Sequence, residues 1–274
     1  QFGAEFRLEE VVGFDFNGDI KTVRTNKDDY RCFGVLLALG AHPRTVGFQG
    51  EEAHSGRGVA YCATCDGEFF TGKEVFVVGG GYAAAEESVF LTKFARHVTI
   101  LDRKDDFSCA ASVADQAKNH EKITVLTNTV MEEVSGENGL TYARYKNTST
   151  GEVTEYKSRE TFGVFVFAGY APATEMVKGV VTLNEQGYIV TDASQKTNVE
   201  GVYAAGDVCI KPLRQVVTAV GDGALAATEL EKYAAKMQKK TGLKPVQPQQ
   251  KKEEPAGEAP VNQAKESALF DSDM

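Results

Sequence analysis

Short apolar runs and helix-like stretches follow one another in the middle of the chain. Residues 73–78 are mostly apolar, residues 83–94 are rich in Ala, Glu and Leu, and residues 98–101 are apolar again. A short apolar run suits a buried strand, and the composition of the longer stretch suits a helix. The pattern therefore predicts a strand, a helix and a second strand, which together form one βαβ unit.

Similar patterns extend this arrangement in both directions. Further strands are expected at residues 5–16, 20–25, 33–39, 123–126, 164–168 and 199–205, and further helices at residues 111–120 and 215–237. We expect the last helix to bury an apolar stripe made of Val216, Val220, Ala224, Ala227 and Leu230. Alternating strands and helices predict an α/β fold with a parallel sheet.

Composition narrows the class of protein. The 274 residues are 42% hydrophobic and 25% charged, as in a globular chain of one or two domains. A net charge of -9 disfavours nucleic acid as a partner, because phosphate binding needs a basic surface. No apolar run is long enough to span a bilayer, so no association with a membrane is expected.

The cysteines and the two ends of the chain indicate its context. Five cysteines without a secretory signal are a poor framework of structural disulfides, so we expect a cytoplasmic protein in which any disulfide is catalytic. The chain begins with Gln1, which we interpret as an internal cut in a longer protein, a processed N-terminus being the alternative. Residues 244–264 are rich in Pro, Gln, Lys and Glu and predict a flexible linker. A further domain is expected to begin near residues 267–270.

Gly79, Gly81 and Ala84 follow the first strand of the βαβ unit and open its helix. In a dinucleotide-binding fingerprint the first glycine makes the tight turn, and the second lets the backbone approach a pyrophosphate. The small third residue lets helix and strand pack closely. The helix N-terminus also offers free N–H groups to phosphates. The spacing predicts a dinucleotide site, with a glycine-rich turn that binds nothing as the alternative.

Asp102, Arg103 and Lys104 follow the second strand, where the ribose of a bound dinucleotide is recognised. A carboxylate there accepts a hydrogen bond from the 2′-hydroxyl of NADH, whereas cations hold the 2′-phosphate of NADPH. The sequence carries both signals. The two adjacent cations favour NADPH, NADH stays possible, and a solvated loop is the alternative for the charges alone.

The run Cys62-Ala63-Thr64-Cys65-Asp66 carries candidate redox chemistry. Two cysteines at this spacing can close a disulfide ring at the start of a helix, where the pKa of a thiol is lowered. The thiolate is the attacking species in disulfide exchange, and the adjacent Asp66 could carry protons to and from the leaving thiol. A zinc site would need two further ligands, and no second pair of Cys or His lies at suitable spacing. We therefore predict a redox pair and no metal, with unreactive buried thiols as the remaining alternative.

A third motif ends a predicted strand with Gly206 and Asp207. Ligands of α/β sheets bind at the carboxyl ends of the strands, where an Asp can accept hydrogen bonds from sugar-like hydroxyls. Arg214 and Gln215 then lead into the last helix. On its own this pattern is typical of an ordinary strand, turn and helix.

Together, the segments CATCDG, VVGGGYAAAE, VYAAGDV and RQVVTAVGDGALAA resemble the low-molecular-weight thioredoxin reductases, which are FAD-dependent pyridine nucleotide-disulfide oxidoreductases. The resemblance covers about residues 30–237 and implies two Rossmann-like dinucleotide-binding domains, the NAD(P)H domain being inserted in a discontinuous FAD domain. The implied segments are 1–45 and 172–237 for the FAD domain, 46–171 for the NAD(P)H domain, and 238–274 for the linker and the start of a further domain. The family's glycine-rich turn for FAD would precede Gln1, so the FAD domain is expected to be incomplete.

The resemblance implies a relay of electrons from NADPH to FAD, to the Cys62–Cys65 disulfide and then to a thioredoxin-like protein. Cys65 resembles the sulfur that faces the flavin, Cys62 the sulfur that attacks the partner's disulfide, and Asp66 the acid/base.

The FAD contacts are implied by the same resemblance. Gly206 and Asp207 would contact the ribityl-pyrophosphate side of FAD, and Arg214, Gln215 and Val216 would lie close to the isoalloxazine. The family is typically dimeric, so a homodimer is expected.

Two other interpretations stay open. One is a reductase that prefers NADH and serves a peroxiredoxin-like protein or a fused carrier domain. It is favoured by Asp102, which stands where the family usually has the His of a His-Arg-Arg run. The other is a flavin- or nucleotide-binding module without turnover, against which the intact run from Cys62 to Asp66 argues.

Overall fold

The computed structural model describes residues 4–244. The expected linker beyond residue 244 and the expected further domain therefore lie outside the described residues. The chain divides into two compact units, one made of residues 1–33 with 235–274 and the other of residues 34–234. Within the described part, none of the helices combines the length and the apolar character that crossing a bilayer requires.

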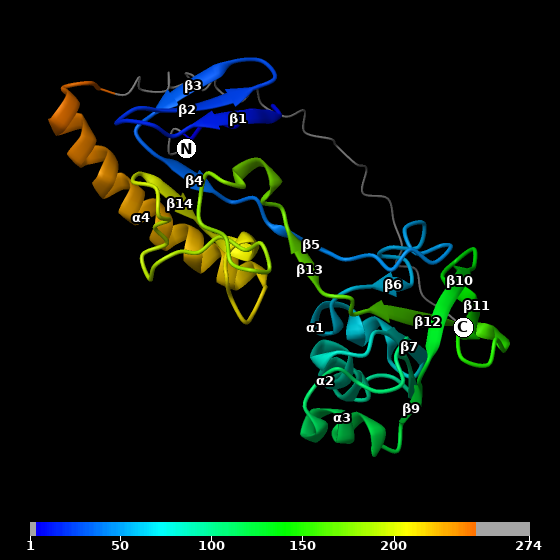
Figure 1. Ribbon diagram of the computed structural model, residues 1–274. Coiled ribbons are helices and arrows are strands. Elements are labelled where there is room, and N and C mark those ends of the chain that lie inside the picture. Colours follow the sequence, from blue (N-terminus) through cyan, green and yellow to red (C-terminus); the bar gives the residue numbers. More distant parts are fainter. Residues whose placement is uncertain (1–3, 245–274) are drawn as a thin grey trace, which may run out of the picture. The chain divides into compact units, whose positions relative to one another are not determined.

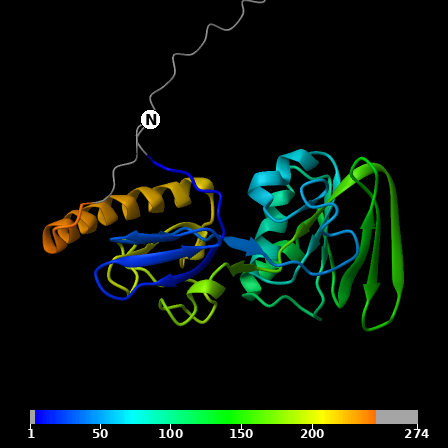
Figure 2. The ribbon, with the colours of Figure 1, turned by 90° about the horizontal axis from the view of Figure 1, so that it is seen from above.

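The described part of the first unit contains an antiparallel meander. Its strands β1 (Val11–Asp15), β2 (Lys21–Thr25) and β3 (Asp29–Cys32) pair in sequence order. Figure 2 shows these strands side by side in blue. Strands β1 and β2 confirm the two strands expected on either side of the Asn17-Gly18-Asp19 turn.

The second unit is built on a seven-stranded sheet in the order β10-β11-β12-β7-β8-β9, with β6 paired to β12. Its strands are β6 (Val59–Ala60), β7 (Glu74–Val78), β8 (His97–Leu101), β9 (Ile123–Leu126), β10 (Thr129–Ser135), β11 (Leu140–Asn147) and β12 (Val153–Val166). Strands β6, β12, β7, β8 and β9 pair in parallel, as the βαβ pattern predicts, whereas β10 and β11 pair antiparallel.

The antiparallel part corrects the expectation of a purely parallel sheet. Hydrophobicity predicts a strand only at residues 164–168, but β12 is 14 residues long and begins at Val153. Its first half alternates between exposed and half-buried positions and contains no apolar run. A pattern search for buried strands therefore misses this half of β12 together with the hairpin that it extends.

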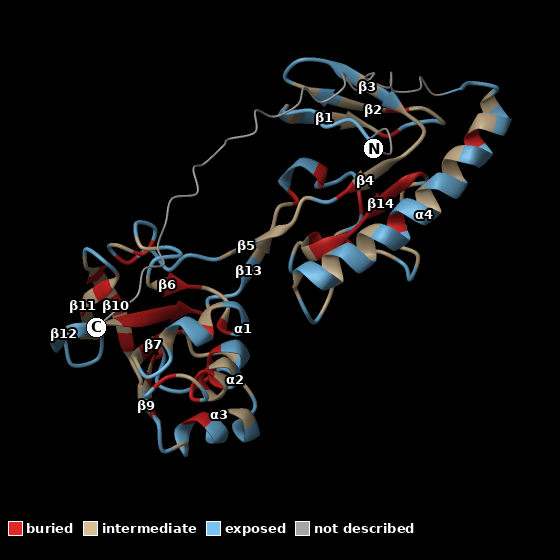
Figure 3. Cartoon of the chain, turned by 180° about the vertical axis from the view of Figure 1, so that it is seen from behind, coloured by how far each residue is buried: buried red, intermediate tan, exposed pale blue. Residues whose placement is uncertain are grey.

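Strand β7 is buried on both faces. Val75 and Val77 lie in a core cluster with residues of helices α2 (Tyr82–Leu91) and α3 (Ala111–Lys118). Phe76 and Val78 lie in a second cluster with residues of β10, β11 and β12. Successive side chains of a strand point to opposite faces, so the helices cover one face at β7 and the antiparallel strands cover the other. Figure 3 shows the strands at the centre of this sheet as largely buried.

A second group of strands joins distant parts of the sequence. Strand β4 (Val35–Leu37) pairs in parallel with β14 (Val202–Ala204), and β5 (Ala41–Pro43) pairs antiparallel with β13 (Tyr170–Pro172). In sequence, the whole seven-stranded sheet is inserted between β5 and β13 (Figure 1). The remaining short turns are α1 (Ala63–Asp66), η1 (Gly67–Phe70), η2 (Glu175–Val177) and η3 (Gly206–Val208).

Helix α4 (Val216–Thr241) confirms the long helix expected at the end but corrects its buried face. Val216 and Val220, which belong to the expected stripe, are 81% and 65% exposed. The helix instead buries Ala226 against Tyr203, with Leu230 packed beside them. A bulky aromatic ring on the sheet requires a small residue opposite it, so shape rather than hydrophobicity sets the buried face.

Truncation of Leu140 tests the packing of the antiparallel hairpin on the sheet. Leu140 is fully buried, so Leu140→Ala is expected to lower the free energy of unfolding by about 2–5 kcal/mol. Val153→Ala is the matched control, because Val153 is 48% exposed, and it should change stability by less than about 0.5 kcal/mol. Denaturant unfolding of the purified variants measures both, and equal effects would contradict this packing.

Candidate active site

The two cysteines of the CxxC run are joined as a disulfide at the start of α1. Cys62 caps the helix, and its Sγ accepts a hydrogen bond from the backbone N–H of Cys65 at 3.1 Å. The Cys65 side of the ring is exposed, while Ala63 between the sulfurs is buried. The ring closes at a helix start as the spacing predicts, and it is open to attack from solvent.

Asp66 directly follows the disulfide and is half-buried. Burial raises the pKa of its carboxyl above the ordinary value, because a desolvated carboxylate loses hydration. A larger fraction of Asp66 therefore stays protonated near neutral pH than in an exposed carboxyl. Such a group can donate a proton to a leaving thiolate and take it back later.

A cavity of about 490 Å³ opens beside Asp66. Arg57, Phe69 and Lys73 contribute to its lining, and the ring of Phe69 is 75% exposed. Sequence reasoning missed these residues. The one available signal was the Phe69-Phe70 pair directly after the CxxC run, since adjacent aromatic rings on a short turn cannot both be buried.

The other cysteines have no such environment. Burial raises the pKa of the Cys209 thiol to about 11 and also raises the pKa values of Cys32 and Cys109. At neutral pH these thiols stay protonated and are poor nucleophiles. Among residues 4–244, no group of three or more His, Cys, Asp or Glu side chains is placed to hold a metal ion.

The glycine-rich turn after β7 has the geometry of a phosphate-binding turn. Gly79 takes a φ of +149°, and a Cβ there would lie 2.7 Å from the Phe167 carbonyl oxygen. Gly81 is the N-cap of α2, and Ala84 in its first turn is fully buried. Backbone can thus approach a ligand closely at Gly81, while Ala84 allows the helix to pack tightly on the strand.

Asp102 stands at the end of β8, facing this turn. Its side chain is 1% exposed, and its Oδ1 accepts the backbone N–H of Lys104 at 3.0 Å. Its Oδ2 is buried without a hydrogen-bond partner. The neighbouring Arg103 and Lys104 are exposed. A ribose hydroxyl would satisfy the unpartnered oxygen, so the residues present fit a bound dinucleotide.

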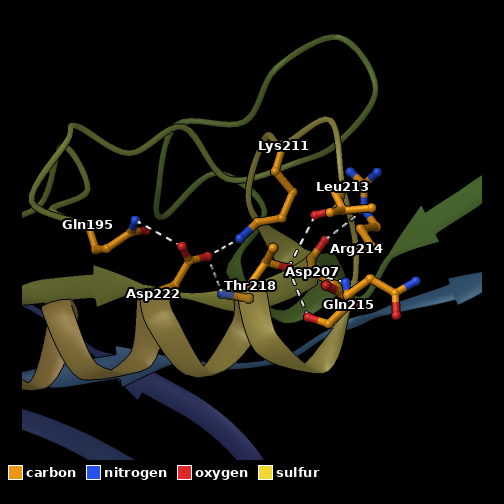
Figure 4. Close-up of polar contacts among 9 residues, drawn as sticks. Gln195, Asp207, Lys211, Leu213, Arg214, Gln215, Thr218 and Asp222 are labelled. Carbon is orange, nitrogen blue, oxygen red and sulfur yellow. Dashed lines mark hydrogen bonds and ion pairs between the residues drawn. The ribbon is translucent and has the colours of Figure 1, made fainter.

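The third motif forms a polar cluster at the end of β14 (Figure 4). Asp222 of α4 accepts the backbone N–H of Gly206 at 3.1 Å and pairs with the ammonium of Lys211. It also accepts a hydrogen bond from the amide of Gln195 at 3.4 Å. Asp222 therefore fixes the turn that presents Asp207, whose Oδ1 is buried without a partner. Asp207 fits a sugar-like hydroxyl for the same reason that Asp102 does. Sequence reasoning missed Asp222 and Lys211, because their separation gave no pairing signal.

Arg214, Gln215 and Val216 take different places at the start of α4. The guanidinium of Arg214 lies over the ring of Tyr188 at 4.3 Å. The side-chain amide of Gln215 lies 3.9 Å from each sulfur of the disulfide. Val216 is largely exposed. The structure thus brings Gln215, but not Arg214, to the CxxC pair.

The chain is similar to known proteins over most of its length. A family model of pyridine nucleotide-disulphide oxidoreductases matches residues 1–223. A thioredoxin reductase from Peptoclostridium acidaminophilum is 50% identical over 236 residues, which cover 85% of this chain and 75% of the relative. A bifunctional thioredoxin reductase/thioredoxin from Mycobacterium leprae is 40% identical over 237 residues, which cover 86% and 51%.

Solved structures agree. A thioredoxin reductase from Streptococcus pyogenes MGAS5005 superimposes with a TM-score of 0.77 at 38% identity, covering 83% of this chain and 74% of that one. Another from Giardia duodenalis gives a TM-score of 0.76 at 32% identity, covering 85% and 76%. These likenesses confirm the predicted α/β fold of the Rossmann type.

Removal of the Asp222 carboxylate tests the polar cluster at the end of β14. Asp222→Ala leaves the Gly206 N–H and the Lys211 ammonium without their acceptor, so it should lower the free energy of unfolding by about 1–3 kcal/mol. Glu231→Ala removes an exposed carboxylate from the same helix and is expected to cost less than about 0.5 kcal/mol. Denaturant unfolding compares the two, and an Asp222→Ala effect no larger than that of the control would contradict the role of Asp222.

Proposed function

The chain belongs to the pyridine nucleotide-disulphide oxidoreductase family, and on this premise we propose that it is a thioredoxin reductase-like enzyme. It passes electrons from a reduced nicotinamide dinucleotide through FAD and the Cys62–Cys65 disulfide to a protein disulfide such as that of thioredoxin. The observation that carries the proposal is an accessible disulfide beside a carboxyl of raised pKa, in a chain half identical to a thioredoxin reductase.

The chemistry of the reduced pair follows from its geometry. The Cys62 thiolate attacks one sulfur of the substrate disulfide, which forms a mixed disulfide and releases the other substrate sulfur as a thiolate. Asp66, in its protonated form, supplies a proton to that leaving thiolate. Cys65 then attacks the Cys62 sulfur, which reforms the ring and releases the second substrate thiol. Bound FAD and dinucleotide supply the two electrons that return the ring to the dithiol.

Two sets of residues hold these cofactors in the proposal. Those for the dinucleotide are Gly79, Gly81, Ala84, Asp102, Arg103 and Lys104, and those for FAD are Gly206, Asp207, Arg214, Gln215 and Val216. The support for each set is a strand end with a close backbone approach and an unpartnered buried carboxylate oxygen. The family resemblance implies NADPH as the donor, with NADH as the alternative.

The proposal extends to domains and partners. Segments 1–45 and 172–237 belong to the FAD domain and residues 46–171 to the NAD(P)H domain, and a cytoplasmic homodimer is expected from the family resemblance. A fused carrier domain is the second candidate acceptor. It is supported by the Mycobacterium leprae relative, whose name joins thioredoxin reductase and thioredoxin. A peroxiredoxin-like acceptor stays an alternative.

Anaerobic titration of the FAD-loaded protein with reduced dinucleotide tests the relay. The wild type should take up two electrons in the flavin and two more in the disulfide, and Cys65→Ser should lose the second pair because no ring can form. Cys209→Ser is the matched control, since the Cys209 thiol is free and buried, and it should keep the full uptake. Bleaching of the flavin with equal uptake by Cys65→Ser would contradict the relay, and failure to bind added FAD would contradict the flavin residues.

Removal of the Asp66 carboxyl tests proton transfer. Asp66→Asn should slow the reaction of the reduced enzyme with a disulfide substrate by about 100-fold near neutral pH, because the proton donor is lost. The wild-type rate should fall as the pH rises through the raised pKa of Asp66, since only the protonated carboxyl donates.

Rapid-mixing kinetics from about pH 5 to about pH 9 measure this dependence. Glu68→Gln, which changes an exposed carboxyl two residues away, should leave both rate and profile unchanged. A profile that Asp66→Asn does not alter would show that another group moves the proton.

A further inference from the structure

We propose that Asp102 selects a dinucleotide with a free 2′-hydroxyl, so that the chain draws electrons from NADH in preference to NADPH. The inference rests on the proposed function, because it requires the glycine-rich turn after β7 to bind a nicotinamide dinucleotide. It goes further in making one side chain the determinant of which dinucleotide is used.

The Asp102 carboxylate is a buried acceptor that lacks a donor. The side chain is 1% exposed, and its Oδ2 has no hydrogen-bond partner. Leaving a buried polar atom unpaired costs about 1–3 kcal/mol, so such atoms are rare without a ligand to satisfy them. A ribose hydroxyl is a neutral donor of the required kind, whereas a phosphate at neutral pH has acceptor oxygens.

The carboxylate is also held in position against the dinucleotide turn. Its Oδ1 accepts the backbone N–H of Lys104, and its carboxyl group occupies the space beside Gly80 where a side chain would otherwise be. Gly80 is fixed in turn, because its carbonyl oxygen accepts hydrogen bonds from the N–H of Ser108 at 2.7 Å and from the Ser108 hydroxyl at 3.1 Å. The acceptor is therefore preorganised where the ribose of a dinucleotide on this turn lies.

The cations of this segment are arranged differently. Arg103 and Lys104 are exposed, so they must be ordered from solvent before they can hold a phosphate. Residues 102–106 carry the three carboxylates of Asp102, Asp105 and Asp106 and the two cations, which gives a net charge of -1. A 2′-phosphate would also lie beside the buried Asp102 carboxylate and be repelled by it. Buried repulsion in a low-dielectric site outweighs attraction from two solvated side chains.

Calorimetric titration of the purified full chain with ADP-ribose and with 2′-phospho-ADP-ribose tests the inference without flavin or turnover. The wild type should bind ADP-ribose at least about tenfold more tightly than the phosphorylated probe, which corresponds to one charge-assisted hydrogen bond. Asp102→Asn keeps the shape and the acceptor for the Lys104 N–H but removes the charge. It should shift the ratio of the two affinities by at least about tenfold toward the phosphorylated probe.

The matched control is Asp105→Asn, which removes the same charge from an exposed neighbour and should leave the ratio unchanged. A purely structural role of Asp102 would lower the melting temperature of Asp102→Asn and leave the ratio as it is, which would overturn the inference. Tighter binding of the phosphorylated probe by the wild type would overturn it as well, whatever the variant does. If neither probe binds, the dinucleotide site of the proposed function fails, and the inference fails with it.

Discussion

The burial of β7 on both faces is the constraint on which the rest of the second unit depends. Its alternate side chains fill two separate cores, so the middle of the strand offers no position for polar chemistry. Polar groups collect where the strand ends, and the glycine-rich turn of Gly79–Gly81 begins at that point. The same rule places Gly206 and Asp207 directly after β14. Both candidate cofactor turns are thus consequences of strand burial.

Helix α2 links the dinucleotide turn to the redox pair. Its first turn contains Gly81 as N-cap and the buried Ala84, while its last residue, Leu91, is fully buried. Ala63, between the two cysteines, lies in the same core cluster as Ala84 and Leu91. A Cβ on Gly67, which follows the CxxC run, would come within 3.2 Å of the Leu91 side chain. The disulfide is therefore mounted on the same helix whose N-terminus faces the phosphates, so an exposed ring keeps a rigid support.

The sequence predicts those features that depend on local chemistry. The CxxC ring, the βαβ unit and the two turn motifs each need particular residues at fixed spacing, and the structure has the corresponding elements at those places. It does not predict the half-exposed strand β12, because a strand that faces solvent along half its length carries no apolar run. The buried face of α4 was missed for another reason, namely that the fit of Ala226 against Tyr203 is a tertiary property. The assignment of residues to cofactors stays a prediction.

Asp102 shows where a sequence motif stops being informative. As letters, one acid followed by two bases gives equal grounds for recognising a hydroxyl or a phosphate. Burial breaks this symmetry, because an ion interacts strongly only where water is excluded, and only the acid is inside. The two bases are solvated, and their attraction for a phosphate is screened by salt, whereas the carboxylate keeps its full effect on whatever lies next to it. The order of charges along the chain is therefore a weaker guide to cofactor choice than their depth in the fold.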